Sequence, residues 1–219
     1  MNSLVKNTIY IWRDSKWILF LSALPPVMAI YLMTQPLFAD FDYEFNAVMG
    51  VLSLVVSLFI ILALSQLKSA RTLVVEIPGG NLYIFYTGFL ITLFSLLVSL
   101  GVVVFFLMFC DTCSLTRGIY FFVLLPLVSA VVGSGLGYLI AVFFPKHSRL
   151  AAMIVLLISI GYNLLCIKYE APIFIYSVLW GYFPGPIYDE WIPVTLTLWI
   201  HRTWSIATGL LFLTVAAMW

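Results

Sequence analysis

The side chains of this sequence that could do chemistry are few and stand far apart. Cys110 and Cys113 flank Asp111 in the sequence CDTC, a spacing that occurs in metal sites. A metal site needs further ligands nearby, but the two histidines, His147 and His201, lie far along the chain. We therefore expect no bound metal, and unpaired thiols at a helix end, with a disulfide on an oxidising face as the alternative.

The remaining acidic groups also fail to form a catalytic pattern. Asp189 and Glu190 are adjacent, so their side chains diverge and do not act as a carboxylate pair. The sequence contains no HExxH, no GxSxG and no GxxxxGK[ST], which argues against a zinc peptidase, a serine hydrolase and a nucleotide site. We expect no enzymatic activity and no cofactor in this chain.

Composition places the chain in a membrane. Hydrophobic residues make up 64% of the sequence and charged residues only 9%, whereas charged residues make up about a quarter of a soluble domain. The apolar runs lack the alternating pattern of outer-membrane strands, so they predict helices. The formal net charge of +1 offers no basic field for nucleic acid.

We predict one all-α integral membrane domain, residues 1–219, with six transmembrane helices. A kink is expected in the first helix at Pro25 and Pro26. None of the predicted helix centres carries the ionisable residues of a proton- or sodium-driven pump. The predicted spans are residues 17–33, 47–67, 83–109, 120–144, 150–167 and 204–219.

The distribution of basic residues orients this topology, because Lys and Arg are enriched in cytoplasmic loops. With a cytoplasmic N-terminus, seven basic residues fall inside and three outside. The inside set is Lys6, Arg13, Lys16, Lys68, Arg71, Lys146 and Arg149, and the outside set is Arg117, Lys168 and Arg202.

The N-terminal segment, residues 1–16, has an amphipathic pattern. Val5, Ile9 and Trp12 share one helical face, while Lys6 and Arg13 lie elsewhere. The pattern predicts a helix lying in the membrane interface. The alternative is that these residues form the wet first turns of the first span.

The segment 168–202 is rich in proline, glycine and aromatic residues. Backbone interrupted so often cannot face lipid at the middle of the membrane, so we expect short external or re-entrant helices around the turn GYFPGPIYDE. We place an external gate at Tyr182, Pro184, Gly185 and Pro186. The alternative is an aromatic interfacial loop that only anchors the chain.

The fourth predicted span carries small residues at four-residue intervals: Ser129, Gly133, Gly137 and Ala141. Such a face lets another helix backbone approach closely. The face could pack within the same bundle or form the seam of a homodimer.

Between the second and third spans, residues 68–82 form a short polar break with its own apolar piece. Lys68 and Arg71 mark it as cytoplasmic, and Pro78 closes a piece too short to span a membrane. We expect this hairpin to lie along the membrane surface, where a cytoplasmic protein can push on it.

This order of features resembles the permeases of type-2 ATP-binding-cassette (ABC) transporters. In that family a coupling helix between spans two and three follows a pattern like R-x-x-G-T-L-E-x-L-x-x-x-P, then a polar turn and G-K-x-L. The same residue types occur in the same order at Arg71, Thr72, Leu73, Pro78, Gly88 and Leu90. The sequence departs from the pattern at Arg71, where glycine is usual, and at Phe89, where lysine is usual.

The resemblance implies a permease in a bacterial-type inner membrane, acting as a homodimer or heterodimer with a cytoplasmic ABC ATPase. The ATPase-coupling residues would be Arg71, Thr72, Leu73, Val74, Val75, Glu76 and Pro78. An interior of Leu, Val and Phe favours an amphipathic or lipid-linked substrate. The alternative is a membrane anchor for a downstream domain, because GYFPGPIYDE resembles a motif of permease-like domains fused to a zinc aminopeptidase-like domain. The chain ends at Trp219 in an apolar run, so we expect the polypeptide or its operon to continue.

Overall fold

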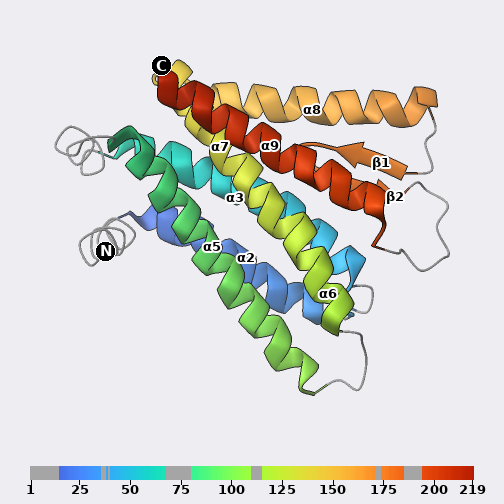
Figure 1. Cartoon of the computed structure of the whole chain (residues 1–219). Helices are drawn as coiled ribbons and strands as arrows, with labels where there is room; N and C mark the ends of the chain where they lie inside the picture. The colour runs from blue at the N-terminus through green and yellow to red at the C-terminus, as the bar shows by residue number, and fades with distance from the viewer. Residues whose placement is uncertain are drawn as a thin grey trace.

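The computed structural model describes residues 15–35, 38, 40–67, 80–109, 115–170, 174–184 and 194–219. These residues form six long helices and one β-hairpin, shown in Figure 1. The helices are α2 (Lys16–Met33), α3 (Tyr43–Gln66), α5 (Gly80–Leu107), the rod α6–η1–α7 (Leu115–Phe122, Val123–Leu127 and Val128–Phe143), α8 (Ser148–Glu170) and α9 (Leu196–Met218).

Five of these helices are long and apolar enough to cross a membrane. They are α2, α3, α5, the rod α6–η1–α7 and α8. The chain is therefore a multi-pass membrane protein, as composition predicts. Helix α9 has the length of a span but includes His201 and Arg202 and is less apolar, so a sixth span remains a prediction.

Polar contacts between helix ends show that successive helices alternate in direction. At the last turn of α3, Gln66 donates to Ser148 at the start of α8 (3.1 Å) and accepts from Arg149 (2.7 Å). At the opposite end of α3, Asp42 bonds to Arg117 in the first turn of α6. The first residues of α6 and the last residues of α3 thus lie at opposite ends of the bundle, as the predicted topology requires.

Helix α3 is the centre of the bundle. It packs against α2, α5, α7, η1 and the hairpin, and more sparsely against α8. Its side chains join four separate core clusters of the described residues, and Leu54, Leu58 and Ile61 are wholly buried. A movement of α3 would therefore act directly on most elements of the bundle, and on α9 through α7.

Small residues bring α7 close to two neighbours. A Cβ atom on Gly137 would lie 2.8 Å from the carbonyl oxygen of Leu58 in α3. A Cβ on Gly133 would clash with the Leu54 carbonyl, and one on Gly135 with the Gly209 carbonyl of α9. The small face that includes Gly133 and Gly137 is thus covered by α3 of the same chain.

The two prolines of α2 do not end the helix. Proline at position 26 has no N–H to bond to the carbonyl of Ser22, four residues earlier. That carbonyl instead accepts from the Ser95 hydroxyl of α5, at 2.5 Å. The carbonyl that proline leaves without a backbone donor is therefore satisfied by a side chain of a neighbouring helix.

The segment between α8 and α9 differs from the prediction. Instead of re-entrant helices, residues 174–184 form an antiparallel β-hairpin, with β1 (Phe174–Ser177) paired to β2 (Gly181–Pro184). The strands are rich in Phe, Ile and Tyr, which favour extended backbone, and Gly181 has φ +95°, which favours glycine. The flanking helices are also longer than expected, since α8 reaches Glu170 and α9 begins at Leu196.

Other predicted boundaries shift or lie outside the described residues. The interval between the third and fourth predicted spans is shorter than expected, because α6 already begins at Leu115. The amphipathic segment 1–16 falls almost wholly outside the described part, which begins at Ser15, the N-cap of α2. The coupling hairpin expected at 68–82 lies outside it up to Gly79, and its last three residues belong to α5, which begins at Gly80.

Candidate functional site: a hairpin inserted beside a buried arginine

The β-hairpin reaches into the bundle between α8 and α9 (Figure 1). At its turn, the Trp180 indole donates to the hydroxyl of Ser159, 2.8 Å away, near the middle of α8. Asn163 of α8 also donates to Ser177 in β1, at 3.3 Å. Since α8 is long enough to span a membrane, the hairpin turn lies well below the end of the helix.

Pairing between the two strands explains how extended backbone can lie at this depth. Within a membrane, backbone N–H and C=O groups must find partners inside the protein. The strands satisfy the backbone groups on their facing edges, and the carbonyl of Tyr182 accepts from the Tyr43 hydroxyl at 2.6 Å. The hairpin is thus fixed to the first residue of α3.

Tyr182 is the buried centre of an aromatic group on this hairpin. Its ring lies 5.6 Å from that of Tyr43 and 5.0 Å from that of Tyr176, centroid to centroid. Tyr182 therefore acts as a packing residue that joins the hairpin to α3.

Beside the hairpin, the rod α6–η1–α7 contains a π-helical turn. The turn spans Val123–Leu127 and includes Pro126, which cannot donate a backbone hydrogen bond. Carbonyls of this buried turn bond to side chains of neighbouring helices: Ser53 of α3 donates to the Pro126 carbonyl at 2.7 Å. The irregular turn is held from both sides, by α3 and by α9.

Arg202 of α9 makes the contacts on the other side. Its Nε donates to the Leu124 carbonyl (2.6 Å), and its Nη2 donates to the Leu125 carbonyl (3.1 Å) and to the Ser129 hydroxyl (2.8 Å). The side chain has 0% exposure, and its Nη1 has no hydrogen-bond partner. Arg202 thus holds the π-turn in place through hydrogen bonds from Nε and Nη2, while its Nη1 has no acceptor.

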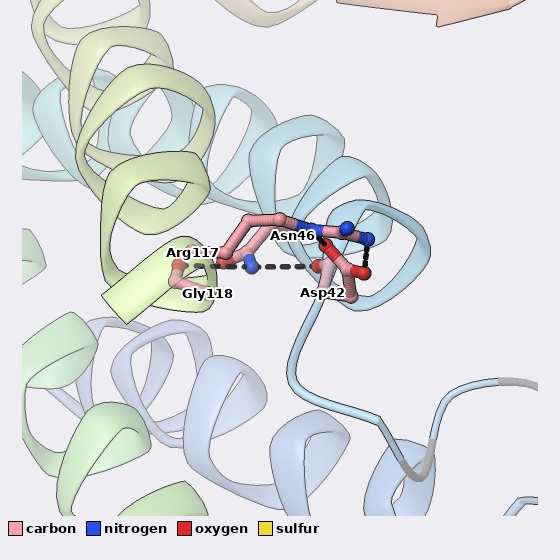
Figure 2. A network of polar contacts seen from close by, with 4 residues as sticks. All are labelled: Asp42, Asn46, Arg117 and Gly118. Atoms are coloured by element: carbon pink, nitrogen blue, oxygen red, sulfur yellow. Dashed lines mark hydrogen bonds and ion pairs between the residues drawn. The ribbon is translucent and has the colours of Figure 1, made fainter. Parts of the chain in front are cut away.

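A second polar cluster joins the starts of α3 and α6, as Figure 2 shows. Arg117 forms an ion pair with Asp42, with Nε 2.6 Å from Oδ1. Between them, the Asn46 amide donates to the Asp42 carbonyl (2.7 Å) and to the Gly118 carbonyl (3.3 Å). This cluster holds the starts of α3 and α6 together.

The hydrogen bonds of these groups position backbone. Within the described ranges, no group of three or more His, Cys, Asp or Glu side chains could hold a metal ion. The arrangement joins the hairpin, α3, the π-turn and α9 through hydrogen bonds from Tyr43, Ser53 and Arg202. Breaking or forming these hydrogen bonds would change which helices are held together.

The structure places some of the predicted site residues in this region. Tyr182 and Pro184 of the expected gate belong to β2, while Gly185 and Pro186 lie outside the described residues. Of the small face, Ser129 accepts from Arg202, and Ala141 packs against the core cluster around Leu58. The whole predicted ATPase-coupling set lies outside the described part: Arg71, Thr72, Leu73, Val74, Val75, Glu76 and Pro78.

Sequence reasoning missed the role of Arg202, which it treated only as an external positive charge. A signal existed: Arg202 stands in an apolar stretch and needs polar partners inside the protein, and Pro126 marks an irregular place in another apolar run. Pairing the two required knowledge of which helices are neighbours.

Comparisons of the chain with protein-family models, with curated proteins and with solved structures find no match.

Proposed function

We propose that this chain is the permease subunit of an ABC-type exporter. It would have six spans with α9 as the last, a cytoplasmic N-terminus, and a second permease subunit, identical or different. A separate cytoplasmic ATPase would drive the movement of an amphipathic or lipid-linked substrate through the inner membrane.

The observation that carries this proposal is the position of α3. One end of α3 leads at Leu67 into the segment with the coupling-like sequence, and the other end bonds to the hairpin through Tyr43. Between these ends α3 packs along α7 and donates to the π-turn through Ser53. A force on residues 68–79 therefore has a direct mechanical route to the hairpin.

The hairpin is suited to act as the external gate. It contacts α8 mainly through the side chains of Ser177 and Trp180, and the spanning window of α8 is only 11% buried. A small shift of α3 would pull Tyr182 and loosen the hairpin from α8. The membrane-facing side between these elements would then open for a substrate with an apolar part.

Substitution in the coupling segment tests the proposal. An apolar interface residue such as Leu73 contributes about 2 to 4 kcal/mol when it is a hot spot, whereas a rim charge such as Glu76 contributes less than about 1 kcal/mol. Leu73→Asp should abolish co-purification of the neighbouring ATPase and transport, with unchanged membrane insertion. Glu76→Ala, the matched control, should weaken coupling mildly.

The same experiment separates a permease from a membrane anchor. Undiminished ATPase binding and transport in Leu73→Asp would remove the coupling role of this segment. Sequencing the DNA beyond the codon for Trp219 adds a second criterion. An adjacent gene with Walker motifs supports the exporter, while an in-frame HExxH domain with no ATPase gene nearby supports the anchor.

A further inference from the structure

The corner at which α7 passes into α8 carries exposed basic side chains. The Phe144 carbonyl closes the turn by accepting from the backbone N–H of His147 at 3.1 Å, and α8 begins at the next residue, Ser148. Lys146, His147 and Arg149 are all exposed here. The corner therefore presents two positive charges, with a histidine between them in the sequence, outside the packed core.

Hydrogen bonds hold this corner against the last turn of α3. Arg149 donates to the side-chain oxygen of Gln66 at 2.7 Å, and the Gln66 amide donates to the Ser148 hydroxyl at 3.1 Å. Because Gln66 is neutral, its bond to Arg149 positions the guanidinium without cancelling its charge. The positive charge of Arg149 thus has a defined place at the end of the bundle.

The acidic residues that the structure describes lie elsewhere. Asp40, Asp42 and Glu44 precede or begin α3, at the opposite end of that helix from Gln66. Glu170 ends α8, a full span away from the corner. Among the described residues, the charge of the corner is therefore not balanced by a neighbouring carboxylate.

An apolar surface adjoins the basic corner. Phe143, near the end of α7, stacks on Trp219 of α9 with ring centroids 5.5 Å apart, where the end of α9 meets the corner (Figure 1). Phe144 is 55% exposed and Leu150 is 61% exposed. Further exposed apolar side chains follow along α8 at Met153, Ile154, Leu157 and Ile158.

This combination of surfaces matches a phospholipid better than a soluble partner. The spanning window of α8 is only 11% buried within the protein, so acyl chains are available to cover its apolar side chains. A phospholipid offers a phosphate for the basic corner and acyl chains for the adjoining helix. A soluble acidic protein would match only the basic part of this surface.

We propose that the α7–α8 corner is a binding surface for anionic phospholipids, such as phosphatidylglycerol. Lys146 and Arg149 attract the headgroup, while the acyl chains lie along Phe144 and the exposed side of α8. Basic residues next to a span attract anionic lipid in this way, and each contributes roughly a fivefold preference. The surface goes beyond the exporter proposal, since it requires neither an ATPase nor a transported substrate.

Quenching of a bimane dye attached to Leu150→Cys measures which lipid lies at the corner. The purified chain, in a cysteine-free background, is placed in nanodiscs with brominated phosphatidylglycerol or brominated phosphatidylcholine of the same acyl chains. We expect stronger quenching by the brominated phosphatidylglycerol at equal mole fraction. High salt should reduce this difference, because salt screens exposed charges.

Substitution of Lys146 tests whether charge at the corner is responsible. Lys146→Gln should lower the preference for phosphatidylglycerol about fivefold, whereas Lys146→Arg should retain it. Lys168→Gln is the matched control, because it removes an exposed lysine at the opposite end of α8 and should leave quenching at position 150 unchanged. The proposal is overturned if the two lipids quench equally when Lys146 is present, which would favour an acidic protein partner, or if Lys146→Gln keeps the full preference.

Discussion

Single side chains of this protein complete the hydrogen bonding of interrupted backbone. Ser95 bonds to the carbonyl left by Pro26 in α2, and Ser53 bonds to the carbonyl of Pro126 in the π-turn. Tyr43 does the same for β2 at Tyr182. In a membrane these groups have no water as an alternative partner, so their loss leaves a buried acceptor unsatisfied.

Removal of the Tyr43 hydroxyl should loosen the hairpin. Tyr43→Phe leaves the Tyr182 carbonyl without its donor and should lower the free energy of unfolding by about 1 kcal/mol. Tyr138→Phe is the matched control, because the Tyr138 hydroxyl is buried without a hydrogen-bond partner, and its removal should be neutral or stabilising. Chemical unfolding in mixed micelles measures both. Equal losses in the two variants would contradict the anchoring role of Tyr43.

At the scale of elements, the sequence predicts where the helices lie, but it does not predict which elements pack against one another. Apolar runs and basic turns were enough to place the helices, because twenty apolar residues have few alternatives in a membrane. The hairpin was missed because a stretch with Tyr176, Gly181 and Pro184 was interpreted as broken helix. Its extended form depends on Tyr43, Ser159 and other side chains of distant helices, which local sequence does not reveal.

The small face of α7 gives a second test at this scale. Gly137→Leu should destabilise the bundle by about 1 to 3 kcal/mol or more, since its side chain would meet the backbone of α3 at Leu58. Gly101→Leu in α5 is the control, because a Cβ there meets nothing within 4 Å. Melting temperature and oligomeric state in detergent are measured for both. An unchanged melting temperature in Gly137→Leu would mean that α3 and α7 do not pack in this way.

At the scale of the whole molecule, the alternating helix directions predict which loops share a side. Cysteine labelling of intact cells, in a cysteine-free background, should reach Asp42→Cys and Tyr188→Cys. It should spare Ser69→Cys and Ser148→Cys, which belong to the side marked by Lys68 and Arg149. Labelling of Ser69→Cys from outside would overturn the charge-based orientation.

The exporter proposal depends on coupling between the two ends of α3. The sequence pattern predicts the residues that would receive the force, Thr72 to Ile77, whereas the three-dimensional structure shows the contacts of the hairpin, the π-turn and Arg202. A direct measurement must perturb one end and observe the other.

The most direct measurement is the labelling rate of a cysteine in the hairpin during ATP hydrolysis. Ser177→Cys is suitable because Ser177 is buried and lies against α8 through Asn163. With the partner ATPase present, ATP should increase the rate at which an external thiol reagent labels this cysteine. Adding Leu73→Asp should abolish the increase, while Glu76→Ala should retain most of it. The same rate with and without ATP would contradict the central claim that α3 transmits movement from the coupling segment to the hairpin.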